Sequence, residues 1–127
     1  MRDHLKLKAF HHADELALEV YRATRGFPKD ELYGLTAQMR RAAVSVPSNI
    51  VEGCGRRTQG DYLHLLDVAF ASLRELQYQV SLAHRLNYVK PEVFQRLDSR
   101  CETTSKLLGS LIRALRRGPP EESEPTK

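Results

Sequence analysis

Histidine and serine are the residue types in this chain that could support metal binding or nucleophilic catalysis. The chain holds five histidines, of which His4 and His11 could share one face of a helix. Di-iron helix bundles need Glu-x-x-His pairs and zinc peptidases need His-Glu-x-x-His, and neither pattern occurs. Ser45 and Ser72 lack any motif that would place a base beside the hydroxyl. We therefore predict a protein that is not an enzyme, with no metal, no cofactor and no small-molecule substrate.

Arginines form the second group of candidates, because several together can bind the phosphates of a nucleic acid. They gather near residues 40, 56 and 113 of a chain whose net charge is +4. The candidate nucleic-acid-binding residues are Arg40, Arg56, Arg57, Arg113, Arg116 and Arg117. An alternative is that basic residues near helix C-termini only complement the helix dipole and keep that end solvated.

Four segments must position these side chains. Apolar residues recur at spacings of three and four over residues 5–25, 36–56, 59–86 and 91–117, which indicates four amphipathic helices. No segment alternates as a strand would, and the connections are short. The sequence predicts an all-α, antiparallel up-down-up-down four-helix bundle over residues 1–117. Residues 118–127, rich in Pro and Glu, are expected to be a disordered tail.

Capping residues mark several helix boundaries. Thr36 and Thr58 are candidate N-caps, and Pro91 suits the first turn of the last helix. The strictest apolar pattern belongs to the third helix and consists of Tyr62, Leu66, Ala69, Leu73, Leu76, Val80 and Ala83. The pattern of the fourth helix consists of Val93, Leu97, Cys101, Thr104, Leu108, Leu111 and Leu115.

Pro47 lies inside the second predicted helix, where proline costs roughly 3 kcal/mol. The helix could end near Val46 and restart, or it could continue with a kink. Because the apolar pattern keeps its register from Val46 to Ile50, we predict one continuous but kinked helix.

Polar residues run beside that apolar pattern. They are Gln38, Arg41, Ser45, Asn49 and Glu52, with Glu75 of the third helix as a possible partner of Arg41. They form either a solvated flank or a polar seam packed against another helix or another subunit. In the second case, changing Arg41 or Asn49 to Ala should weaken folding or assembly, because hydrogen-bond partners would be left unsatisfied.

The stretch "FPKDELYGLTAQMRRAAVSVPSNIVEGCGR" resembles the signature of the bacterial four-helix bundle proteins. These are also called intervening-sequence proteins, since some are encoded within inserts in large-subunit ribosomal RNA genes. The resemblance covers about residues 7–117, although the family usually has Gly at Ala71 and an aromatic residue near His11 or His12. It implies a bundle that can form a ring-like homo-oligomer, such as a pentamer. The accessory protein of diversity-generating retroelements is similar in fold, and it binds nucleic acid and a reverse transcriptase.

Two functional hypotheses follow. In an up-down bundle the ends of the second and fourth helices meet, so their arginines should converge and bind RNA or DNA through the backbone. The alternative is a homo-oligomeric scaffold that binds protein, which a large apolar outer groove would favour. The sequence shows no signal peptide and no apolar stretch that could span a bilayer, and its two cysteines lack metal spacing. We expect a cytoplasmic protein.

Overall fold

The computed structural model describes residues 2–118, and all regular structure within that range is helical. The four long helices are α1 (Lys8–Thr24), α2 (Leu35–Cys54), α3 (Gln59–Arg85) and α4 (Pro91–Arg117). Two short 3-10 turns, η1 (His4–Lys6) and η2 (Lys29–Glu31), precede α1 and α2. The tail expected over residues 118–127 lies, beyond Gly118, outside the described residues.

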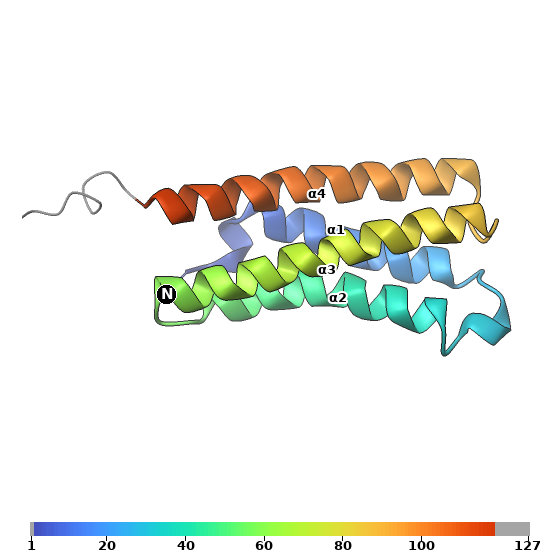
Figure 1. Cartoon of the computed structure of the whole chain (residues 1–127), viewed down its shortest axis with the longest axis horizontal. Coiled ribbons are helices and arrows are strands. Elements are labelled where there is room, and N and C mark those ends of the chain that lie inside the picture. The colour runs from blue at the N-terminus through green and yellow to red at the C-terminus, as the bar shows by residue number, and fades with distance from the viewer. Residues whose placement is uncertain (1, 119–127) are drawn as a thin grey trace, which may run out of the picture.

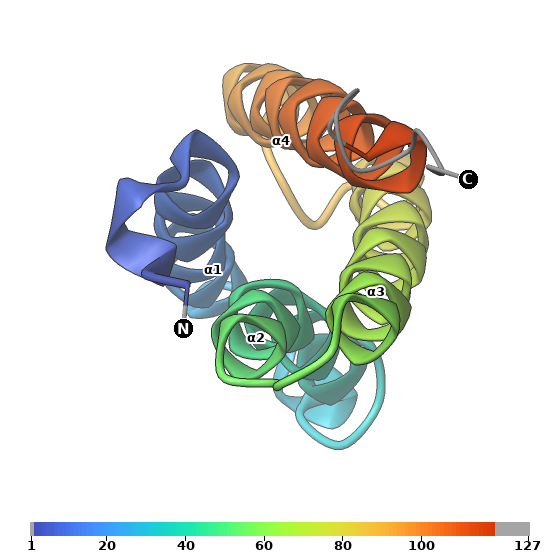
Figure 2. The same cartoon turned by 90° about the vertical axis from the view of Figure 1, so that its left-hand side faces the viewer.

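Each helix runs antiparallel to the next, as Figure 1 shows. Contacts join α1 to α2, α2 to α3, α3 to α4, and α4 back to α1. Seen from one end, the helices therefore stand at the corners of a square around a shared core (Figure 2). The predicted fold class, an up-down-up-down four-helix bundle, is confirmed.

The core forms where the apolar patterns meet. All seven predicted core residues of α3 are buried, and Leu66, Leu73 and Leu76 have no exposed surface. In α4 the prediction fails near the C-terminus, where Ile112 is buried and Leu111 and Leu115 are only half-buried. A strict alternation of four and three assumes 3.5 residues per turn, whereas an α-helix has 3.6. The inward face therefore moves on by one residue along this long helix.

Local sequence signals explain the starts of α3 and α4. The Thr58 hydroxyl accepts a hydrogen bond from the Asp61 N–H at 3.1 Å, as the sequence predicts. Pro91 occupies the first turn of α4. The prediction for Thr36 is wrong, because Gly34 is the N-cap and Thr36 is buried inside α2.

Glu31 takes over the capping of α2. Its Oε1 accepts from the Leu35 N–H at 2.9 Å, and its Oε2 accepts from the Tyr88 hydroxyl at 2.8 Å. These two hydrogen bonds, the Leu35 bond first, lower the pKa of the Glu31 carboxyl. One carboxylate thus joins the start of α2 to the connection between α3 and α4.

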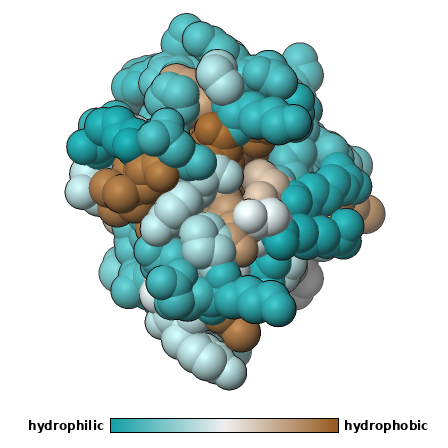
Figure 3. Space-filling view, turned by 90° about the vertical axis from the view of Figure 1, so that its right-hand side faces the viewer, coloured by the Kyte–Doolittle hydropathy of each residue, from teal (hydrophilic) through white to brown (hydrophobic). Residues whose placement is uncertain are grey.

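The same end of the bundle carries exposed apolar side chains. Leu32, Tyr33 and Leu86 lie there, and Tyr33 is 93% exposed. The space-filling view of this end shows brown surface between hydrophilic groups (Figure 3).

Pro47 lies within α2, which is continuous from Leu35 to Cys54. The predicted continuity is confirmed, and the residues on both sides of Pro47 explain it. Val46 and Ile50 are both fully buried, so core packing continues across the site where one backbone hydrogen bond is missing.

Replacing Pro47 by Ala is expected to stabilise the fold by about 1 kcal/mol. The helix regains about 3 kcal/mol of propensity. It loses the burial of about two ring methylenes at roughly 0.8 kcal/mol each. Urea unfolding at constant m-value measures the difference, and a destabilised variant would show that the Pro47 ring is needed for packing.

Candidate functional site

Five of the six arginines singled out in the sequence meet at one end of the bundle. Because α2 and α4 both run toward that end, their C-terminal residues share it. Arg2, which sequence reasoning missed, joins them from the N-terminal segment. We call this surface the arginine-rich end and define it by Arg2, Arg56, Arg57, Arg113, Arg116 and Arg117.

Arg2 fastens the N-terminal segment to the loop between α2 and α3. Its guanidinium donates to the Arg56 carbonyl and to Gln59 Oε1, both at 3.2 Å. It also lies 4.2 Å from the centre of the Tyr62 ring, within cation–π range. Burial raises the pKa of Tyr62 to about 12, so the phenol stays neutral beneath the cation.

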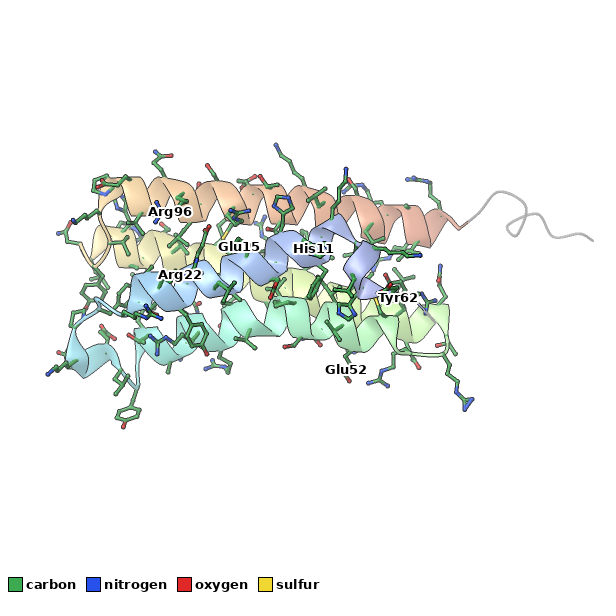
Figure 4. The ribbon with its side chains drawn as sticks, turned by 180° about the vertical axis from the view of Figure 1, so that it is seen from behind. His11, Glu15, Arg22, Glu52, Tyr62 and Arg96 are labelled. Carbon is green, nitrogen blue, oxygen red and sulfur yellow. The ribbon has the colours of Figure 1, made fainter. Side chains whose placement is uncertain are left out.

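Gln59 continues this network to α4, where its Nε2 donates to the Leu115 carbonyl at 3.2 Å. The α2–α3 loop is thereby held against the last turn of α4. Figure 4 shows this end of the bundle with Glu52 of α2 and Tyr62 of α3 labelled. The backbone that presents the arginines is therefore fixed, and all of the arginine side chains except that of Arg2 are exposed.

Two of the arginines form ion pairs. Arg56 lies 2.6 Å from Glu52, and Arg116 lies 2.6 Å from Asp67. All four side chains are about half exposed, so each pair contributes roughly 0–1 kcal/mol and can be exchanged for another anion.

The remaining arginines of this end have no carboxylate partner among residues 2–118. Arg113 donates only to the Ser110 hydroxyl, at 3.3 Å, and Arg57 and Arg117 are exposed. The surface therefore keeps positive charge that is available to a phosphate group.

Arg40 does not belong to this surface. It lies near the opposite end of α2, where its Nε donates to the Thr24 hydroxyl at 2.8 Å and its guanidinium covers the Tyr21 ring. Its position in the sequence beside Arg41 suggested a role in binding, but these contacts join α2 to α1. Arg40 is a packing residue in this structure.

Only some of the polar residues predicted to form a seam on α2 pack against another helix. Ser45 and Ser72 share a hydrogen bond of 2.8 Å between α2 and α3, and Asn49 donates to the Ser45 carbonyl and hydroxyl. These three residues are half-buried, whereas Gln38, Arg41 and Glu52 are exposed.

The predicted partnership of Arg41 and Glu75 is wrong. Arg41 donates to Gln38 on its own helix, and Glu75 accepts from Gln79 on its own helix.

Asn49 and Arg41 are therefore expected to respond differently to alanine substitution. Asn49→Ala should lower the free energy of unfolding by about 1–2 kcal/mol, because two half-buried hydrogen bonds are lost. Arg41→Ala should change it by less than about 0.5 kcal/mol. Urea unfolding measures the free energy of unfolding of both variants. Equal losses would show that Arg41 makes stabilising contacts in an assembly that a single chain does not display.

The two cysteines are buried in the core, and the two serines singled out in the sequence contact each other. Burial raises the pKa of the Cys101 thiol to about 12 and raises that of Cys54 as well, so both thiols are protonated at neutral pH. Ser45 and Ser72 bond to each other. Within residues 2–118, no three His, Cys, Asp or Glu side chains gather as metal ligands would. The helices of that range are also too short or too polar to cross a membrane.

Comparison with known protein families gives a match over most of the chain. The model of the family described as "23S rRNA-intervening sequence protein" matches residues 5–110. The chain belongs to this family. The suspected relationship is thereby confirmed, and the match covers all of α1, α2 and α3 and most of α4.

A solved structure has the same fold. It is a protein with unknown function from the S23 ribosomal protein family of Bacteroides thetaiotaomicron VPI-5482. The two chains superpose with a TM-score of 0.77 at 20% identity, over 84% of this chain and 96% of the other. No curated protein matches the sequence. At this identity the likeness concerns the fold, and neither description names an enzymatic activity.

Proposed function

We propose that this member of the family is a non-enzymatic, self-assembling bundle that binds structured RNA through its arginine-rich end. The observation that carries the proposal is the convergence of six arginines from the N-terminal segment, the α2–α3 loop and α4. Structured RNA is the first nucleic acid to test, because the description of the family refers to 23S rRNA.

Binding would be directed at the phosphate backbone. The large exposed aromatic side chains Tyr21, Tyr33 and Tyr78 lie away from the arginine-rich end, and Tyr62 is buried beneath Arg2. Base stacking needs an accessible aromatic face. Affinity should therefore depend on shape and charge and fall steeply with salt.

Self-assembly has its own support in a groove on the surface of the bundle. A groove of about 480 Å³ lies between α1 and α2, with Phe10, Ala17 and Pro47 among its apolar lining residues. Val44 and Val51 also line it and are 40% and 38% exposed. Apolar side chains at a groove are typical of protein interfaces. A ring would repeat the arginine-rich end and gain avidity without new contacts.

The groove also favours a second function, that of a homo-oligomeric scaffold for protein partners that does not bind nucleic acid. The two functions share assembly and differ in the role of the arginines.

Two measurements on the wild-type chain test the proposal. Light scattering at micromolar concentration should give a mass that is a multiple of 14.5 kDa. Filter-binding titration of a structured RNA should show affinity falling on the order of a hundredfold between 50 and 200 mM salt, for about five phosphate contacts. A monomeric mass would contradict assembly, and absent binding at low salt would favour the scaffold.

A further inference from the structure

A second charged site lies at the end of the bundle opposite the arginine-rich end. A pocket of about 420 Å³ opens there between the C-terminal half of α1 and the beginning of α4. Its apolar lining comes from Ala23, Val89 and Val93, and Tyr88 closes one wall. Figure 3 shows this end, where brown surface lies between hydrophilic groups. The volume falls within the range of sites that hold small molecules.

Three cations line this pocket, namely Arg22 of α1, Lys90 immediately before α4, and Arg96 of α4. Figure 4 labels Arg22 and Arg96 toward the same end of the bundle. Arg22 has one loose ion pair, with Glu15 at 3.7 Å, and both side chains are about half exposed. Among residues 2–118, Lys90 and Arg96 make no ion pair and no side-chain hydrogen bond. Their charge is therefore available to a ligand.

One carboxylate, that of Glu19, also lines the pocket. Arg100 donates to its Oε2 at 3.1 Å, and the Glu19 side chain is only 11% exposed. Its other oxygen, Oε1, is buried and has no hydrogen-bond partner among residues 2–118. Arg100 balances the charge of Glu19 through Oε2 alone, and the three cations of the pocket outnumber this one carboxylate.

The start of α4 adds to this positive field. Lys90 is the N-cap of a helix of 27 residues, and Pro91 follows it. The first N–H groups of a helix have no partner within it and carry partial positive charge. This contribution reinforces the side chains and would not make a site alone.

We propose that this pocket binds a small, soluble organic phosphate monoester. A monoester carries close to two negative charges at neutral pH, which complements the excess of cations. The guanidinium groups of Arg22 and Arg96 suit phosphate oxygens, to which they can donate two parallel hydrogen bonds. The apolar walls of Ala23, Val89 and Val93 fit the organic part of the ligand. This ligand site is separate from the RNA-binding surface and does not depend on it.

Calorimetric titration of the full chain with phenyl phosphate tests the proposal. We expect saturable binding with a Kd of about 1 mM or below. Inorganic phosphate should bind several-fold more weakly, because it leaves the apolar walls unfilled, and uncharged benzyl alcohol should not bind measurably. Equal affinities for the two phosphates, or no saturable binding of phenyl phosphate, would overturn the proposal.

A matched pair of variants locates the binding. Replacing Arg22 and Arg96 together by Ala should weaken phenyl phosphate binding at least about tenfold, because both phosphate ligands are lost. Replacing Arg57 and Arg113 by Ala makes the same change in net charge at the opposite end and should leave this affinity unchanged. Circular dichroism checks that both variants are folded. Undiminished binding by the first variant, or an equal loss in the second, would overturn the assignment.

A lipid phosphate presents the same chemical group, and a vesicle arm separates the two sources. Vesicles that contain phosphatidic acid should not bind at this pocket. The chain should therefore not sediment with them, and they should not displace phenyl phosphate. Sedimentation that the Arg22 and Arg96 substitutions abolish, together with an absence of phenyl phosphate binding, would overturn the soluble ligand.

Discussion

Reversing Arg57, Arg113 and Arg117 to Glu is expected to lower the affinity for structured RNA at least about a hundredfold at low salt. Three attractive contacts with phosphates become repulsive, and the loss is repeated in every subunit of an assembly. These three residues are exposed and have no carboxylate partner among residues 2–118, so their reversal breaks no internal ion pair. Arg116 is left unchanged because a glutamate there would face Asp67 and disturb the fold.

The control reverses Arg25, Lys29 and Arg74, which are exposed outside the arginine-rich end. It changes the net charge by the same amount, so a loss confined to the first variant assigns binding to that surface. Gel-shift titration at two salt concentrations measures both. Equal losses would indicate a general charge effect, and full binding by both would place the RNA elsewhere or favour the scaffold.

Leu73→Ala is expected to cost about 3–4 kcal/mol of stability. Leu73 has no exposed surface and lies in the middle of α3, which packs against both α2 and α4. Removing its branched end loses transfer free energy and leaves a cavity that the helices cannot fully close. For a domain of this size the melting temperature should fall by roughly 10–15 °C.

Leu18→Ala is the matched control, because Leu18 is 46% exposed on α1 and undergoes the same chemical change. It should cost less than about 1 kcal/mol. Both melting curves should be recorded at two protein concentrations, since assembly would make the midpoint depend on concentration. A small effect at Leu73 would mean that the core is loosely packed around α3.

The sequence was sufficient to predict the helices and the core residues of α3, because both depend on local periodicity. Thr58 and Pro91 act through neighbouring residues, and both were predicted correctly. The start of α2 could not be predicted in this way. Its capping carboxylate, Glu31, is held by Tyr88, which is 57 residues away in the sequence. Only the folded bundle brings those two groups together.

The candidate site likewise has one part that the sequence predicts and one part that it does not. The arginines of α2 and α4 lie at one end because four antiparallel helices bring the C-termini of α2 and α4 together. The number of helices was predicted from the sequence. Arg2 belongs to the surface through the Tyr62 ring and the Arg56 carbonyl, and no pattern in the sequence encodes those contacts. The separate position of Arg40 follows from its hydrogen bond to Thr24 on α1. The proximity of Arg40 to other arginines in the sequence therefore did not predict its position in the fold.

An even number of antiparallel helices returns the chain to the side from which it started. Arg2 and Arg117 therefore lie at the same end of the bundle, and this is the arginine-rich end. A fluorescent label attached beside Arg2 or at Gly118 would lie next to those arginines, and an acidic label would compete for them directly. A binding experiment on such a labelled chain would report a weakened affinity. A label on the connection between α3 and α4, around Leu86 and Asn87, would lie a full helix length away and leave the arginines accessible.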